Sequence, residues 1–183
     1  MIGFKLVTEM INTVICHIAI MLFIIFMPLF AHAVNEFATI DVSATIAPAC
    51  EAGTVISGGS ISFGTLDFSQ KTFLNQDTAT TGGTGSGGIR IKCVQNTSVK
   101  ITMDSGNSGN VQQRYMQNSV SGQKIWYNLY TEATHTTVWD NVTGITIQAT
   151  GVDQWLPVYG LVPAQTSPSI GVYTDVIPVT ITW

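Results

Sequence analysis

Apolar and polar residues alternate with a period of two along most of the chain after Ala33, and this pattern constrains the fold more than any other feature. The clearest runs are 38–46, 89–93, 99–104, 125–130 and 173–183. Such alternation is typical of strands with one buried face, whereas an amphipathic helix repeats every 3.6 residues. Because no sustained helical repeat follows Ala33, we expect an all-β domain.

Turn-forming residues divide these runs at intervals typical of a β-sandwich or barrel. They gather at 57–60, 75–88, 104–110, 119–123, 141–144 and 163–171. Pro157 and Pro178 lie within strand-like runs, where the missing amide N–H favours a sheet edge or a bulge. With no internal repeat and no domain boundary in view, we expect residues 34–183 to form one domain.

The first 33 residues differ from the rest. Residues 10–30 carry no charge, and Ala31-His32-Ala33 follows them with the small-x-small pattern that signal peptidase cleaves. We therefore expect residues 1–33 to be a signal peptide that is removed on export. An uncleaved membrane anchor is the alternative, since an uncharged run of 21 residues can span a bilayer. The sequence is compatible with a start at Met1 or at Met10.

The charge balance and the number of cysteines argue against nucleic-acid binding and a metal site, and they favour a disulfide. Seven Lys and Arg against eleven Asp and Glu leave no basic surface of the kind that binds nucleic acid. Removal of residues 1–33 leaves two cysteines, Cys50 and Cys93, which in an oxidising compartment most simply form one disulfide. Two free thiols are the alternative. A metal site is disfavoured, because His135 is the one histidine after residue 33.

Three short stretches of the sequence resemble a nucleotide site, a calcium site and a catalytic site, and each is better explained as a loop. The glycines of 83–88 match a dinucleotide fingerprint, but a strand is expected after them where phosphate binding needs a helix. Residues 104–110 offer one carboxylate where a calcium loop has several. His135 lies in a turn-like run, so we assign no catalytic residue and expect no enzyme.

Aromatic residues could form a sugar-binding platform or, more commonly, part of a sandwich core. The candidates are Trp126, Tyr127, Tyr130, Trp139, Trp155 and Tyr159.

A series of short motifs follows the first alternating run in a fixed order. The motifs are 47–50 (APAC), 61–68 (ISFGTLDF), 87–93 (GGIRIKC), 101–106 (ITMDSG), 114–116 (RYM), 126–130 (WYNLY), 157–160 (PVYG), 171–175 (GVYTD) and 179–183 (VTITW). This order resembles the spore coat protein U family and, within it, the Csu-type pilins of archaic chaperone–usher pili.

The resemblance implies an incomplete immunoglobulin-like β-sandwich that lacks its last strand and is completed by donor-strand exchange. A periplasmic chaperone would lend a strand during export. At an outer-membrane usher, the N-terminal segment of the next subunit would then replace it. Such a head-to-tail contact does not close on itself, so it builds a fibre. The implied protein is a structural subunit without cofactor or metal, serving surface attachment and biofilm formation.

The resemblance also places roles on residues of this chain. The donor segment falls on 34–46, with pocket-filling side chains at Ile40, Val42, Ala44 and Ile46. The disulfide falls on Cys50 and Cys93. The strand that the chaperone engages falls on 173–183, with an apolar face towards the core formed by Ile177, Val179, Ile181 and Trp183.

Three alternatives stay open at this point. Residues 40–46 could serve partly as a core strand of their own domain, because only 16 residues separate Ala33 from Cys50. The protein could be a secreted spore or cell coat protein of the same fold. It could also be a monomeric carbohydrate-binding β-sandwich. The leading expectation places it in the periplasm in transit and then on the cell surface.

Overall fold

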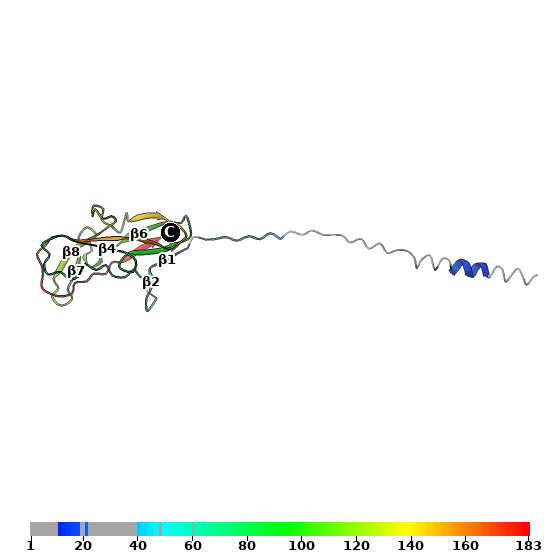
Figure 1. Cartoon of the computed structure of the whole chain (residues 1–183), viewed down its shortest axis with the longest axis horizontal. Coiled ribbons are helices and arrows are strands. Elements are labelled where there is room, and N and C mark those ends of the chain that lie inside the picture. Colours follow the sequence, from blue (N-terminus) through cyan, green and yellow to red (C-terminus); the bar gives the residue numbers. More distant parts are fainter. Residues whose placement is uncertain (1–10, 19–20, 22–39, 48, 60) are drawn as a thin grey trace, which may run out of the picture. The chain divides into compact units, whose positions relative to one another are not determined.

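The computed structural model describes residues 11–18, 21, 40–47, 49–59 and 61–183 (Figure 1). The chain divides into two units, Met1–Ala44 and Thr45–Trp183. In the first unit, residues 11–18 are helical. Within the described ranges, the helices fall short of the length and hydropathy that a bilayer crossing requires. The expected cleavage site, Ala31-His32-Ala33, lies outside the described residues.

The second unit is built from strands, which confirms the all-β prediction. The strands are β1 (Cys50–Ala52), β2 (Thr54–Val55), β3 (Ile61–Ser62), β4 (Thr78–Gly82), β5 (Ile89–Cys93), β6 (Ser98–Met103), β7 (Arg114–Gln117), β8 (Lys124–Tyr130), β9 (Ile145–Gln148), β10 (Gln154–Leu156), β11 (Val158–Val162) and β12 (Val179–Thr182), with a short 3-10 helix, η1 (Gly106–Ser108). Their ladders are antiparallel.

The sheets are open rather than closed into a barrel. Their strand orders are β1-β5-β10, β4-β11-β8-β7, β12-β6-β9 and the small pair β2-β3. The chain passes directly from β10 to β11 at Pro157, and these two strands belong to different sheets. Because proline cannot donate to a ladder, it suits a point where the chain leaves one sheet for another. Pro157 is expected at an edge or a bulge, and it lies between two strands, at the point where the chain changes sheet.

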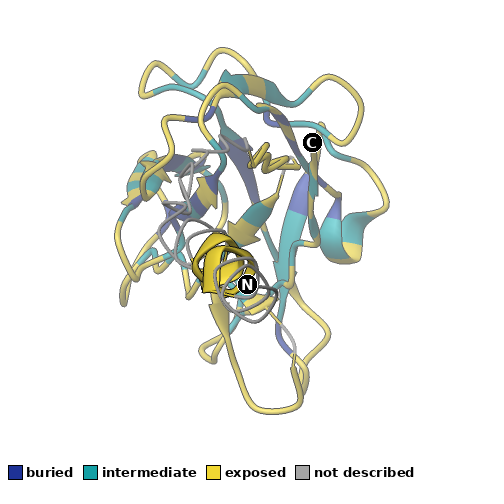
Figure 2. Ribbon diagram, turned by 90° about the vertical axis from the view of Figure 1, so that its right-hand side faces the viewer, coloured by how far each residue is buried: buried dark blue, intermediate teal, exposed yellow. Residues whose placement is uncertain are grey.

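The hydrophobic core draws on all three larger sheets. Its fully buried side chains come mainly from the alternating runs of β5 and β6, which are Ile89, Ile91, Cys93, Val99, Ile101 and Met103. The residues between them in these two strands point outward or are half-buried, as period-two patterning predicts. Figure 2 shows buried segments on the strands and on parts of some loops, whereas much of the loop surface is exposed. Trp139, from the loop between β8 and β9, is buried with this cluster.

Candidate functional site

The last strand of the chain, β12, has a strand neighbour on one side only. It pairs antiparallel with β6, and the order β12-β6-β9 leaves its other edge without a strand among the described residues. An unpaired edge presents backbone N–H and C=O groups that pair readily with another chain. β12 is therefore a place where this fold can accept an added strand.

The side chains around β12 alternate as predicted. Ile177, Val179 and Ile181 pack against the core, yet each is only half-buried. Thr180 on the opposite face is exposed. The alternation predicts that Trp183 faces the core, but its side chain is 56% exposed. It lies one residue beyond the end of β12, so the pairing with β6 does not extend to it.

The segment before β12 is held in place by a carboxylate. Asp175 accepts a hydrogen bond from the Tyr127 hydroxyl at 2.8 Å through one oxygen. Its other oxygen accepts the backbone N–H of Asn107 at 2.9 Å. Further along, the backbone N–H of Asp104 donates to the carbonyl oxygen of Pro178 at 2.9 Å. Residues 175–178 are thereby fixed to β8 and to the loop after β6, so β12 begins at a defined position.

Arg114 lies beneath this region with none of its surface exposed. Its Nε donates to the Asp104 carbonyl at 2.9 Å, and Nη1 donates to Asn128 Oδ1 at 2.6 Å. Nη2 donates to the carbonyl oxygens of Met103 at 3.1 Å and Trp139 at 2.8 Å. One guanidinium thus joins β7 and β8 to the end of β6, the strand on which β12 is built. Arg114 lies in the motif at 114–116, and the sequence alone indicates no role for it.

Burial shapes the titration of two groups here. Desolvation lowers the pKa of the Arg114 guanidinium, while the neighbouring Tyr127 and Asp175 act in the opposite direction. Burial, followed by the hydrogen bond to Asp175, raises the pKa of the Tyr127 phenol well above its ordinary value. Tyr127 therefore stays a neutral hydrogen-bond donor at physiological pH.

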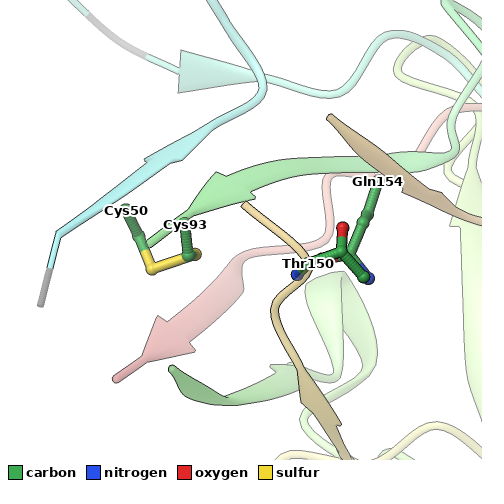
Figure 3. Close-up of a disulfide and its surroundings, with 4 residues drawn as sticks. All are labelled: Cys50, Cys93, Thr150 and Gln154. Carbon is green, nitrogen blue, oxygen red and sulfur yellow. A yellow bond between two sulfur atoms is a disulfide. The ribbon is translucent and has the colours of Figure 1, made fainter. Parts of the chain in front are cut away.

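The disulfide predicted between Cys50 and Cys93 is confirmed. The two residues lie directly opposite each other in the β1–β5 pair (Figure 3). Beyond them, the backbone N–H of Val94 donates to the carbonyl oxygen of Ala49 at 3.0 Å, which extends the pairing. Because Cys93 is buried, the disulfide anchors the start of the β domain to its core.

The described part of the expected donor segment forms no strand. Residues 40–47 lie outside the sheets, and the side chains of Ile40, Val42 and Ile46 are 87%, 91% and 79% exposed. The small side chain of Ala44 is exposed as well. The alternation predicts a half-buried strand, but residues 40–47 pair with no strand among the described residues. Residues 34–39 lie outside the described residues.

The glycine and calcium patterns of the sequence are loops in the structure. Residues 83–88 form a tight turn in which Ser86 N and Gly88 N donate to the Gly83 carbonyl. The strand β5 follows them, not a helix. The Asp104 carboxylate is occupied by the backbone N–H and hydroxyl of Ser105. Among the described residues, no three His, Cys, Asp or Glu side chains gather as a metal site would require.

His135 belongs to a loop organised by a carboxylate. Glu132 accepts hydrogen bonds from the Thr131 hydroxyl, the Thr136 hydroxyl and the backbone N–H of Thr137. The Thr131 bond, followed by those of Thr136 and Thr137, lowers the pKa of Glu132 to about 2. The His135 ring packs edge-on against Tyr130, and its Nε2 is buried without a hydrogen-bond partner. This geometry is that of a packed loop.

The aromatic residues do not form one platform. Trp139 and Tyr127 are core residues, whereas Trp126 and Trp155 are each 38% exposed on different sheets. The remaining two are half-buried and lie opposite each other on β8 and β11: Tyr130 and Tyr159.

Comparisons with known proteins give one family. The model of the Spore Coat Protein U domain matches residues 36–180. A curated relative, Protein U of Myxococcus xanthus, is 28% identical over 162 residues, which is 84% of this chain and 88% of the relative.

Solved structures of pilus proteins show limited similarity. The chaperone–tip adhesion subunit complex of the archaic Csu pili of Acinetobacter baumannii matches with TM-score 0.44 and 19% identity, over 76% of this chain and 40% of that one. The P pilus rod subunit PapA matches with TM-score 0.44 and 16% identity, over 73% of this chain and 97% of that one.

Proposed function

The chain belongs to the Spore Coat Protein U domain family, and from this premise we propose that it is a structural subunit of an archaic chaperone–usher pilus. The observation that carries the proposal is the edge of β12, which is unpaired among the described residues and lies beside half-buried core residues. The role is structural rather than catalytic. The motifs shared with Csu-type pilins point to the same assembly.

Donor-strand complementation would provide a hydrogen-bonding partner for the edge of β12 and a buried environment for the exposed apolar residues of the donor segment. The edge of β12 gains main-chain hydrogen bonds when a strand is added to it, and alternate side chains of that strand fill pockets in the acceptor. Ile40, Val42 and Ile46 alternate and are exposed, so they fit the role of the added strand for a neighbouring copy. Burying each side chain stabilises the contact by about 1.5–3 kcal/mol as an upper estimate.

The proposal sets the order in which the protein binds its partners. Residues 1–33 direct export and are removed. A periplasmic chaperone then covers the edge of β12, and at the outer-membrane usher residues 34–46 of the next subunit replace the chaperone strand. The product is a surface fibre that serves attachment and biofilm formation.

A pair of single substitutions in residues 34–46 tests the proposal. Val42→Asp places an unpaired carboxylate in an acceptor pocket, where desolvation costs several kcal/mol. Ser43→Asp places the same charge on the opposite face of the strand and serves as the control. We expect Val42→Asp to remain bound to the chaperone without forming fibres, and Ser43→Asp to form them. Fibres of normal length with Val42→Asp on electron micrographs would overturn the proposal.

The Val42→Asp variant also tests the alternative role of residues 40–46 as a core strand. In that case Val42→Asp would prevent folding, and the chaperone complex would disappear along with the fibres. The exposed, unpaired state of residues 40–47 favours the donor role.

A secreted coat protein of the same fold is the second candidate, favoured by the relative named Protein U. A coat protein would accumulate at the surface without a fibre. In that case Val42→Asp and Ser43→Asp would change its surface level equally.

A further inference from the structure

An aromatic and lysine cluster lies on β7 and β8, which run side by side (Figure 1). Tyr115 and Trp126 are directly opposite each other, with ring centroids 5.4 Å apart and ring planes at 83°. The Lys124 ammonium nitrogen lies 3.9 Å from the Tyr115 ring centroid and 5.9 Å from that of Trp126. We refer to Tyr115, Lys124 and Trp126 as the Tyr–Lys–Trp patch.

The Tyr–Lys–Trp patch is held in place by hydrogen bonds to the Trp126 backbone and to the Tyr115 side chain. The Gln165 side chain accepts the backbone N–H of Trp126 at 3.0 Å and donates to its carbonyl oxygen at 2.9 Å. The Tyr115 hydroxyl donates to the carbonyl oxygen of Asn107 at 2.8 Å. The Tyr115 ring and the backbone of Trp126 are thus held in place before any ligand arrives, which lowers the entropic cost of binding one.

The patch retains unused binding capacity. Trp126 is 38% exposed although it is a large aromatic residue. Among the described residues its indole N–H makes no hydrogen bond, since the contacts to Gln165 involve only the backbone. The exposed Lys124 has no carboxylate partner within this part of the chain, where the ion pair is Arg90–Asp153. The patch therefore combines an available ring, a free donor and an uncompensated cation.

These groups match one ligand chemistry. The apolar face of a pyranose ring packs against an aromatic ring, and the indole N–H donates to a sugar hydroxyl. An ammonium group attracts a carboxylate. We propose that the Tyr–Lys–Trp patch binds an acidic saccharide, with the carboxylate of a uronic acid residue beside Lys124 and its ring against Trp126.

The net charge of the chain does not oppose this assignment. The formal charge of −4 repels anions at long range. At physiological ionic strength, however, charges more than about 8 Å away are largely screened. The Lys124 ammonium lies within contact distance of a ligand on Trp126 and so decides the local interaction.

The patch is separate from the strand-addition site. It belongs to the sheet β4-β11-β8-β7, whereas the edge proposed to accept the donor strand is that of β12 in the sheet β12-β6-β9. In Figure 1, β7 and β8 lie towards the end of the β domain opposite the C terminus. Saccharide binding is therefore independent of the proposed function and can fail or succeed without it.

Binding of tetragalacturonate to the exported protein, measured by calorimetry, tests the proposal. Lys124→Met keeps the alkyl chain and removes the charge, and Trp126→Ala removes the ring. The matched control is Trp155→Ala, because Trp155 is equally exposed but lies on β10. We expect Lys124→Met and Trp126→Ala each to weaken binding by about tenfold or more, and Trp155→Ala to leave it unchanged. Raising NaCl from about 50 mM to about 500 mM should weaken binding by the wild type.

The following results would overturn the proposal. It is wrong if the wild type does not bind tetragalacturonate or if Lys124→Met binds as the wild type does. It is also wrong if neutral maltotetraose or a tetraglutamate peptide binds as tightly as tetragalacturonate. The Lys124 side chain is exposed and makes no hydrogen bond among the described residues, so this variant decides the matter even if Trp126→Ala fails to fold.

Discussion

Replacing Arg114 with methionine should destabilise the β domain severely, because the guanidinium is the common donor to several buried acceptors. Its loss leaves the carbonyl oxygens of Met103, Asp104 and Trp139 without this donor. Each buried acceptor left unpaired costs about 1–3 kcal/mol. Methionine recovers part of this, since a buried charge no longer has to be desolvated. We expect a net loss of about 3–5 kcal/mol in the free energy of unfolding.

Urea unfolding of the disulfide-intact protein measures this loss, with the fluorescence of the buried Trp139 as one reporter. The control is Arg90→Met, because Arg90 is 26% exposed and holds one ion pair with Asp153 and one bond to the Gly53 carbonyl. A partly exposed pair of this kind contributes about 0–1 kcal/mol. The reasoning is refuted if Arg114→Met costs no more than Arg90→Met.

Three further predictions concern the disulfide, the Glu132 loop and the last strand. Cys50→Ser with Cys93→Ser should lower the free energy of unfolding by about 4 kcal/mol, since the disulfide closes a loop with a sequence separation of 43; unchanged urea unfolding would contradict this. Folding lowers the pKa of Glu132 from 4.5 to about 2, so its carboxylate stabilises the fold above pH 4.5 and this contribution is lost as pH falls towards 2. Acid titration of Glu132→Gln should therefore show a smaller loss of stability over that range than the wild type, and equal losses would count against it. Deleting residues 179–183 should abolish co-purification with the chaperone and lead to degradation, whereas a soluble, stable monomer would mean that the edge of β6 needs no cover.

The strands were predictable wherever alternation has a partner within the chain. The runs at 89–93 and 99–104 became β5 and β6, because each has a buried face that the same domain covers. The run at 38–46 has the same alternation, yet its described part is exposed and unpaired. Alternation with a period of two predicts a strand with one buried face. It does not indicate whether the partner that covers this face belongs to the same chain or to another one.

The interior contacts could not be read from the sequence. Trp139 and Trp126 are the same residue type in neighbouring segments, but the first is fully buried and the second is 38% exposed. Their burial depends on which loop folds over which sheet, and no local pattern encodes this. Arg114 is a stronger case, because its acceptors are backbone carbonyls from separate segments, which carry no side-chain signature.

The central claim is that residues 34–46 of one copy lie along the unpaired edge of β12 in another, and disulfide trapping tests it most directly. Thr180 is exposed on β12, and Asp41, Ser43 and Thr45 occupy the same-facing positions of the donor segment. We expect Thr180→Cys combined with one of Asp41→Cys, Ser43→Cys or Thr45→Cys to give a ladder of oligomers on non-reducing gels of surface fibres. The same donor variants combined with Thr134→Cys, an exposed loop position, should give none. The account is contradicted if none of the three Thr180→Cys pairs forms a ladder or if the Thr134→Cys pairs form it equally well.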